Sequence, residues 1–500
     1  MIQMIGGEMP AWVEDRPAAG GALFGHLTGH LPDGATVLVA GPHDDRLIDA
    51  LAARTRVTCL VRSQPKAAEL DARGLDVLCG TLTKVTDADR FDAVVALDGL
   101  GRLCSVEGPQ LDWVESLQAL KQTLRPGGIL LLTVENELGV HRLVDPASAT
   151  TGKSDEDWLP LGEFDTKPGN PARLAELLDT EGLTIGWLGT VWPAPAAPTL
   201  IATPDALRDG PVDALAAATA GAVGRAYTDR PVLSDPRRLA AAAVRGGLAA
   251  ELAAAWLVVA HRSPRPLTTL SLPPVLLGDG PVVEVAPDSA GGWVRRVVRE
   301  EAGRDLSGLT GPLPAGRLLE EVLLGACLRH DLPLVRRLLT GWMAALPQGS
   351  ADNVVVHADA YAILDPSVPS DGDVLRRFAR TLLAGGYTHP WPAATDLRAL
   401  TSVLRAAAGL PDVATDVPPD VPLAGSWREH EEQLRAVRTQ LADAAARIQW
   451  FERQLDRREN ELRKARLQIA TFSGTVSFRV AKLGVGMARK ARNRLRKGLK

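Results

Sequence analysis

The chain has few cysteines and no long apolar run, and each shortage excludes a class of protein. Only four of the 500 residues are cysteine and none forms a Cys-x-x-Cys pair, which argues against a disulfide framework or a zinc site. The opening residues, MIQMIGGEMPAWVEDRP, have neither the basic nor the apolar segment of a secretory signal. The longest apolar stretch, residues 247–260, is interrupted by Glu251 and is too short to span a bilayer, so we interpret it as a buried helix. These features predict a cytoplasmic protein.

The charge is divided unevenly along the chain. Residues 426–500 contain 19 lysines and arginines against 8 acidic residues, a net charge of +11. Because the whole chain carries −4, the other 425 residues carry −15. An acidic body with a basic end predicts that this end meets an anionic partner.

Residues 35–204 alternate between β-rich runs and helical stretches. The runs are ATVLVAG (35–41), RVTCLV (56–61), LDVLCG (75–80), FDAVVALDG (91–99) and GGILLLTVEN (127–136). Nearly continuous apolar runs are typical of strands buried on both faces, so we expect an α/β domain with a parallel sheet over residues 1–205. A lead-in helix over 20–31, a helix at 171–181 and an antiparallel pair of strands ending the sheet complete this prediction.

Residues 206–408 give a less regular pattern, which we interpret as a mixed α+β domain. The pattern predicts helices near 213–225, 236–261, 315–345 and 373–406, with β-rich segments at 267–287 and 353–364. Four prolines in GLPDVATDVPPDVPLAG then predict a linker over residues 409–425.

Residues 426–471 repeat with a period of seven. One apolar residue recurs at every seventh position, and a weaker row lies three residues further on. The first row comprises Leu434, Leu441, Ile448, Leu455, Leu462 and Ile469. This spacing predicts a coiled coil through which the chain associates with itself, and a single amphipathic helix packed on the body is the alternative.

Three segments in order, VLVAGPHDDRLIDAL, VTCLVRS and LRPGGILLLTVEN, resemble the class I S-adenosylmethionine-dependent methyltransferases. The turn at 124–128 before the fifth strand is the best single match, and ENELGVHRLV (135–144) resembles enzymes encoded beside polysaccharide glycosyltransferases. The resemblance covers about residues 20–205. It implies a Rossmann-like fold, S-adenosylmethionine as cofactor, and a sugar or glycoconjugate hydroxyl as the methyl acceptor.

The same resemblance places the cofactor in the loops after the early strands. The positions that correspond to cofactor contacts are Gly41, Pro42, His43, Asp45, Val61, Arg62, Leu97 and Asp98. Only one of three expected loop glycines is present, because His43 and Asp45 occupy the other two positions. The expected acidic residues are also replaced, by Val39, by Val61 or Arg62, and by Thr81. Either other groups bind the cofactor, or the fold is kept as a non-catalytic scaffold.

Two further sets of residues are candidates for chemistry. Glu135 and His141 follow the fifth strand, at the sheet edge where substrates of this fold bind, and are the catalytic candidates. In DNVVVHADAYAILDP, Asn353 and Asp365 are twelve residues apart, as in the magnesium-binding hairpin of aminoglycoside-phosphotransferase-like kinases, and a plain hairpin is the alternative. No Walker loop and no Gly-x-Ser-x-Gly motif is present.

The basic end, residues 472–500, has nine lysines and arginines and no acidic residue. Apolar residues are interleaved with these charges, which favours an amphipathic helix on the anionic inner surface of a membrane. A nucleic-acid partner is disfavoured because aromatic residues are few and no recognition module precedes the segment. A solvated terminus is the remaining alternative.

Overall fold

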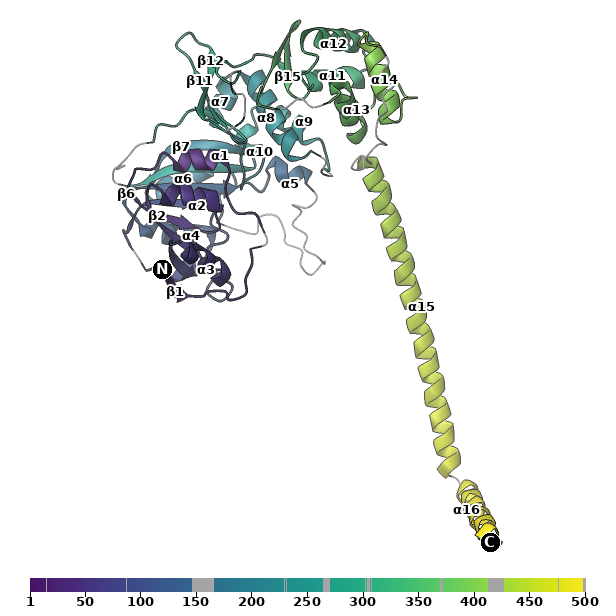
Figure 1. Cartoon of the computed structure of the whole chain (residues 1–500). Coiled ribbons are helices and arrows are strands. Elements are labelled where there is room, and N and C mark those ends of the chain that lie inside the picture. Colours follow the sequence, from purple (N-terminus) through teal and green to yellow (C-terminus); the bar gives the residue numbers. More distant parts are fainter. Residues whose placement is uncertain are drawn as a thin grey trace. The chain divides into compact units, whose positions relative to one another are not determined.

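The computed structural model of the chain describes residues 1–14, 16–86, 88–145, 166–228, 230, 232–263, 270–301, 303, 306, 308–368, 372–411, 427–474 and 476–497. It divides into two compact units, Met1–Trp427 and Arg428–Lys500 (Figure 1). Most of the predicted linker, residues 412–425, lies outside the described residues.

The first unit contains the predicted α/β sheet. Its parallel strands, in chain order, are β1 (Ile2–Gly6), β2 (Thr36–Ala40), β3 (Arg56–Val61), β4 (Asp76–Gly80), β5 (Phe91–Ala96) and β6 (Leu124–Glu135). They lie in the order β1-β4-β3-β2-β5-β6, and all neighbouring pairs are parallel. The five strands expected from the sequence are therefore confirmed, in the doubly wound order of Rossmann-like folds. The short strand β1 was not predicted.

Both faces of this sheet are covered by helices. The covering helices are α1 (Ala22–Thr28), α2 (Asp45–Ala52), α3 (Gln64–Ala72), α4 (Trp113–Thr123) and α6 (Pro171–Thr180). Val37 and Val39 of β2 pack in the core under α1–α3, whereas Leu38 and Ala40 pack in the core under α4 and α6. Burial on both faces explains the continuous apolar runs. A 3₁₀ helix at Leu82–Lys84 and a short α5 (Val140–Val144) follow β4 and β6.

The sheet continues beyond β6 with antiparallel strands. These are β7 (Leu183–Trp192), β8 (Leu200–Ala202), β9 (Ala255–Arg262), β10 (Val275–Leu277), β11 (Val282–Pro287), β12 (Trp293–Arg299) and β13 (Gly311–Pro312), in the order β9-β7-β8-β10-β11-β12-β13. The predicted antiparallel pair is confirmed as β7–β8, but it does not end the sheet. Because β9 lies between β6 and β7, one continuous sheet crosses the predicted domain boundary at residue 205.

The helix predicted over residues 236–261 is wrong in its second half. Helix α9 (Pro236–Arg245) ends before Gly246, and only α10 (Ala249–Leu252) precedes strand β9. The apolar stretch 247–260 is therefore largely the buried strand β9 and not a buried helix. A fully buried strand and a buried helix both give an unbroken apolar run, so periodicity could not separate them.

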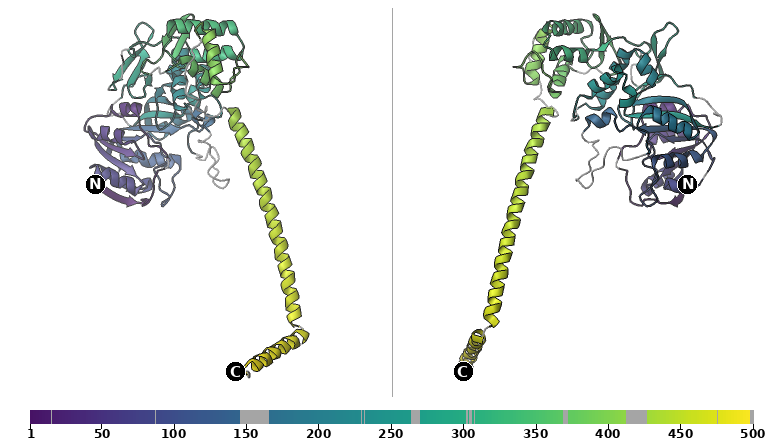
Figure 2. Two further views of the ribbon diagram at one scale, coloured as in Figure 1. Left: turned by 45° about the vertical axis from the view of Figure 1, so that its right-hand side comes forward. Right: turned by 180° about the vertical axis from the view of Figure 1, so that it is seen from behind.

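The remaining helices of the first unit form two groups. α7 (Pro204–Asp209), α8 (Val212–Ala226) and α9 pack on β8, β10 and β11. The other group is α11 (Leu319–Leu328), α12 (Leu332–Ala345), α13 (Val374–Ala384) and α14 (Leu397–Ala407), which share a core with a three-stranded sheet (Figure 2). That sheet is β14 (Arg317–Leu318), β15 (Val354–His357) and β16 (Ala360–Ile363).

The second unit is helical. Helix α15 (Trp427–Gly474) is continuous over 48 residues, and α16 (Val476–Lys497) follows it. The predicted helix over 426–471 is therefore confirmed, while its self-association stays a prediction. Among the helices of the described ranges, none is both long and apolar enough to cross a membrane.

Candidate functional site

The carboxyl ends of β2, β3 and β5 meet at one edge of the sheet, where Rossmann-like proteins bind ligands. Gly41 follows β2 with a φ of +87°, a left-handed conformation that glycine adopts without strain. A Cβ atom on Gly41 would also lie 3.2 Å from Leu103 Cδ2. The one loop glycine that the chain retains is thus required by the backbone itself.

His43 occupies the position of the second expected glycine, and its ring is buried. Its Nδ1 lies 3.0 Å from the Gly41 carbonyl oxygen, and the Leu97 N–H donates to its Nε2 at 3.2 Å. The ring therefore joins the loop after β2 to the loop after β5. Burial lowers the pKa of His43 to about 4, so the ring is neutral at physiological pH, with the proton on Nδ1.

A segment before α1 lies over this edge of the sheet. We call residues 9–20, except Asp15, the strap. Its backbone is bonded to the loop after β3 through Met9 N–H to Arg62 O at 2.8 Å. It is bonded to the loop after β2 through Ala19 N–H to Pro42 O at 3.2 Å and Asp44 N–H to Ala19 O at 2.8 Å. Ser63 Oγ also donates to Trp12 O at 2.7 Å. The strap thus bridges two loops that the resemblance assigns to the cofactor.

Arg62 is one of the two residues, with Val61, that correspond to the expected ribose-binding acid, and it binds an acid of the strap. Its Nε and Nη2 donate to the two carboxylate oxygens of Glu14, each at 2.9 Å. Its guanidinium carbon lies 5.2 Å from the centre of the Trp12 ring. Both members of the Arg62–Glu14 pair are less than one-fifth exposed, so solvent screens their attraction little.

A second arginine holds the other end of the strap. Arg102 binds Asp98 through Nη2 and through Nε, with the Nε bond at 2.8 Å. The same guanidinium donates to the carbonyl oxygens of Arg16 at 3.0 Å and Pro17 at 2.8 Å. Burial raises the pKa of Asp98 to about 6, against the lowering effect of Arg102.

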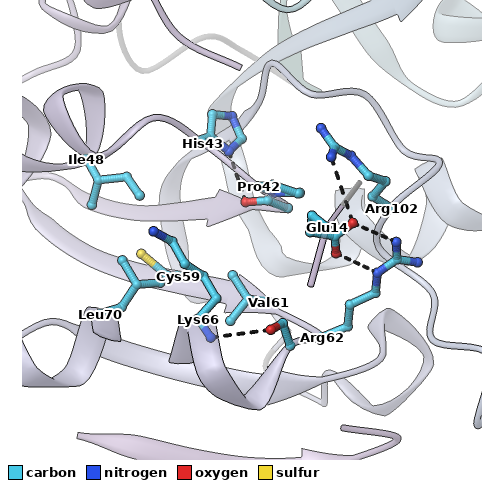
Figure 3. Close-up of a pocket in the computed structure, with 12 residues that line it drawn as sticks. Glu14, Pro42, His43, Ile48, Cys59, Val61, Arg62, Lys66, Leu70 and Arg102 are labelled. Carbon is cyan, nitrogen blue, oxygen red and sulfur yellow. Dashed lines mark hydrogen bonds and ion pairs between the residues drawn. The ribbon is translucent and has the colours of Figure 1, made fainter. Parts of the chain in front are cut away.

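These groups leave little open space. The cavity between them measures about 20 Å³, and Glu14, Pro42, His43, Val61 and Arg62 are among its lining residues (Figure 3). Roughly 10–15 Å³ accommodates one water molecule, whereas small-molecule sites measure about 300–1,000 Å³. At the position that the resemblance assigns to it, the residues present therefore do not fit S-adenosylmethionine, because the strap and the His43 ring occupy this space.

The other predicted cofactor residues have structural partners. Asp45 binds Lys66 at 2.9 Å and Arg73 at 2.6 Å, between α2 and α3, and does not line the cavity. Leu97 contributes its N–H to His43, as described above. Thr81, at the position of the third expected acid, accepts a hydrogen bond from Ser105 N–H at 3.1 Å through Oγ1.

The structure brings together the two catalytic candidates. Glu135 Oε1 lies 3.2 Å from His141 Nε2 and accepts hydrogen bonds from Arg142 at 2.8 and 3.0 Å. Burial alone would raise the pKa of Glu135, but the His141 hydrogen bond and the Arg142 charge lower it to about 2. A carboxylate with so low a pKa is a weak base at neutral pH, so Glu135 is suited to orienting His141.

The predicted metal candidates close a hairpin. Asn353 Nδ2 donates to the Asp365 carbonyl oxygen at 2.7 Å, and Asp365 N–H donates to Asn353 Oδ1 at 2.9 Å. The Asp365 carboxylate accepts from Ser367 Oγ at 2.6 Å and Ser367 N–H at 3.0 Å. This geometry agrees with the plain hairpin, because the Asn353 amide faces backbone groups.

Comparisons with known proteins give likeness in structure alone. No family model matches the chain, and no curated protein matches it. Among solved structures, the chain is similar to 1,6-didemethyltoxoflavin-N1-methyltransferase of Burkholderia thailandensis, at 15% identity and a TM-score of 0.26 over 48% of this chain and 77% of that one. It is also similar to an S-adenosylmethionine-dependent methyltransferase of Mesorhizobium loti, at 15% identity and a TM-score of 0.28, over 47% of this chain and 96% of that one. The likeness to the [4+2]-cyclase SpnF has 17% identity and a TM-score of 0.27, over 49% of this chain and 81% of that one.

Sequence reasoning missed the residues that fill the edge of the sheet. Glu14 and Arg102 stand outside every motif of the resemblance. The signal for Glu14 was Arg62 itself, since a cation at the end of a buried strand needs an acidic partner. The signal for Arg102 was its position four residues after Asp98.

Proposed function

We propose that this protein is a pseudo-methyltransferase scaffold, a Rossmann-like core that does not use S-adenosylmethionine and that oligomerises through α15. The observation that carries the proposal is the filled crevice. The His43 ring and the Arg62–Glu14 pair lie where the resemblance places a cofactor, and together with the strap they leave about 20 Å³. Opening this site would break the buried ion pair and the strap's backbone hydrogen bonds together.

Calorimetric titration of the full chain with S-adenosylmethionine and S-adenosylhomocysteine tests this proposal. We expect no saturable heat up to about 1 mM ligand, a binding free energy weaker than about −4 kcal/mol. A class I methyltransferase with intact loop glycines, titrated under the same conditions, is the positive control. Saturable binding of either ligand by this chain would overturn the scaffold proposal.

The Glu135–His141 pair favours a second candidate function. In this alternative S-adenosylmethionine would supply the methyl group, and His141, oriented by Glu135, would accept the proton of a sugar or glycoconjugate hydroxyl. This candidate requires saturable cofactor binding in the titration above. It also requires that His141→Gln abolish methyl transfer without weakening the binding of S-adenosylhomocysteine.

The proposed oligomerisation relies on the exposed seam of α15. Its six apolar residues at seven-residue spacing are all between 49% and 71% exposed in the single chain: Leu434, Leu441, Ile448, Leu455, Leu462 and Ile469. A strict seven-residue repeat keeps one face toward a supercoiled partner helix, and a second copy of the chain supplies that helix.

We expect the full chain to sediment at a multiple of its 53.1 kDa mass. The double variant Leu441→Lys/Leu455→Lys should sediment as a monomer, because it puts charges into the seam. The matched control Ala446→Lys/Asn460→Lys places the same charges on the opposite face of the helix and should keep the oligomer. A wild-type chain of monomer mass would contradict the proposed coiled coil.

We further propose that α16 binds an anionic membrane surface. Val480, Leu483, Val485 and Met487 are more than half exposed, and basic residues are interleaved with them. We expect the chain to float with vesicles that contain phosphatidylserine at low salt, and to lose this binding at high salt, where charge attraction is screened. Arg489→Gln/Arg492→Gln should bind more weakly. Failure to float at low salt would refute surface binding. If the chain retained nucleic acid instead, the basic end would be a nucleic-acid-binding segment.

A further inference from the structure

Three metal-ligating side chains meet away from the filled crevice. His26 lies in the last turn of α1, His30 follows two residues after that helix, and Glu284 comes from β11. One nitrogen of each histidine and one carboxylate oxygen all lie within 4.8 Å of one another. The chain continues as a turn after α1, through Gly29 N–H to Gly25 O at 3.2 Å, so histidines four residues apart stay on one side.

His30 and Glu284 are each held by one hydrogen bond and keep one atom for a ligand. His30 Nδ1 lies 2.9 Å from the His26 carbonyl oxygen, which can only accept, so Nδ1 carries the proton and Nε2 has the lone pair. Glu284 Oε2 accepts from Arg296 at 2.5 Å, while Oε1 faces His26 Nε2 at 3.7 Å. Second contacts of this kind fix the orientation of metal ligands.

His26 Nε2 is the atom that most needs a partner. It is buried and has no hydrogen-bond partner among the described residues, and 3.7 Å is too long for a bond to Glu284. A buried polar atom without a partner requires an explanation, and an ion is one.

Space for further ligands lies next to the histidines. His26 and His30 both line a cavity of about 380 Å³, together with Arg54 and Arg299. Zinc held by three protein ligands commonly keeps a fourth position for water or another ligand. The two arginines would favour an anion at that position.

We propose that His26, His30 and Glu284 bind one divalent transition-metal ion, with zinc favoured by the two imidazole nitrogens and one carboxylate oxygen. Arg296 and Arg299 add positive charge near the site. The negative charge of the Glu284 carboxylate offsets this repulsion of a metal cation. The sequence contains the spacing His-x-x-x-His at 26–30, but this motif was not recognised from the sequence, and the carboxylate comes from a strand more than 250 residues away.

The test uses the full chain after treatment with a chelator and dialysis. Zinc is titrated in competition with a chromophoric chelator, and cobalt is added separately to follow its visible absorption. We expect one equivalent to bind. His26→Ala, His30→Ala and Glu284→Gln should each weaken binding by at least about 100-fold, more than is expected from replacing a residue that only orients a ligand. His357→Ala, an exposed histidine of β15, is the matched control and should bind as the wild type does.

The Glu284→Gln variant and the wild-type chain give the two decisive measurements of zinc binding. Glu284→Gln keeps the size of the side chain and its contact with Arg296, so it remains informative if a histidine variant does not fold. Lack of zinc binding by the wild-type chain would overturn the proposal. Equal binding by the wild type and the three ligand variants would also overturn it, because the metal would then lie elsewhere.

Discussion

Replacing His43 with alanine is expected to lower the free energy of unfolding by about 2–4 kcal/mol. The ring is buried and joins two loops, so its loss leaves the Leu97 N–H and the Gly41 carbonyl without their partner. Each buried group left unpaired costs about 1–3 kcal/mol, and the cavity left by the ring adds to this cost. Urea unfolding of the wild type and His43→Ala at pH 7 measures the difference.

The same pair of proteins gives a pH test with a defined sign. In the unfolded chain His43 takes up a proton near pH 6.5, whereas in the folded chain its pKa is about 4. The neutral ring therefore contributes stability that is present above pH 6.5 and lost as the pH falls toward 4. The difference in free energy of unfolding between the wild type and His43→Ala should shrink as the pH falls through this window. The control His357→Ala should have the same free energy of unfolding as the wild type at each pH. An advantage that grows at low pH would contradict the buried, neutral ring.

Replacing Arg237 with methionine is expected to have the largest effect on stability, a loss of about 3–5 kcal/mol. Arg237 Nη1 binds Glu320 Oε2 at 2.6 Å, and its Nε lies 3.3 Å from Asp235 Oδ1. Tyr387 OH donates to the same Asp235, so the network joins α9 to α11 and to the turn after α13. Burial raises the pKa of Glu320, while the Arg237 charge opposes this shift. Without Arg237, the Glu320 carboxylate is left buried and uncompensated.

A double-mutant cycle isolates this interaction. Arg237→Met/Glu320→Gln should be less destabilised than the sum of the two single variants, because it also removes the Glu320 charge that Arg237→Met alone leaves unpaired. Arg208→Met is the matched control, since Arg208 makes its ion pairs on the exposed surface and should give no measurable change. Urea unfolding provides the free energies, and additive effects in the cycle would contradict a coupled buried network.

The sequence predicted the parallel part of the sheet because its signal is local. Val37 to Ala40 are apolar without alternation, and both faces of β2 are buried as that pattern requires. The same local signal was ambiguous in 255–262, where a buried strand gives the run expected of a buried helix. Its place between β6 and β7 depends on pairing with residues more than 60 positions away, which no local pattern encodes.

The site was predicted in part. Gly41, Val61 and Arg62, which the resemblance assigns to one site, do line one small cavity, while their role in binding a cofactor stays a prediction. The sequence did not reveal what fills that edge of the sheet, because the strap is irregular and its two arginine partners, Arg62 and Arg102, lie about 50 residues or more further along the chain. Arg62 stands near the position where an acid was expected, and Glu14 of the strap supplies the negative charge that pairs with it.

Hydrogen exchange tests most directly whether the chain's own residues fill the crevice. The informative amides are those of Met9, Ala19 and Leu97, whose N–H groups bond Arg62 O, Pro42 O and His43 Nε2. Exchange would be followed by mass spectrometry on the full chain, with and without millimolar S-adenosylhomocysteine. We predict slow exchange at all three sites, unchanged by the ligand. Rapid exchange without ligand, or a change at these amides when ligand is added, would contradict a crevice closed by the strap and His43.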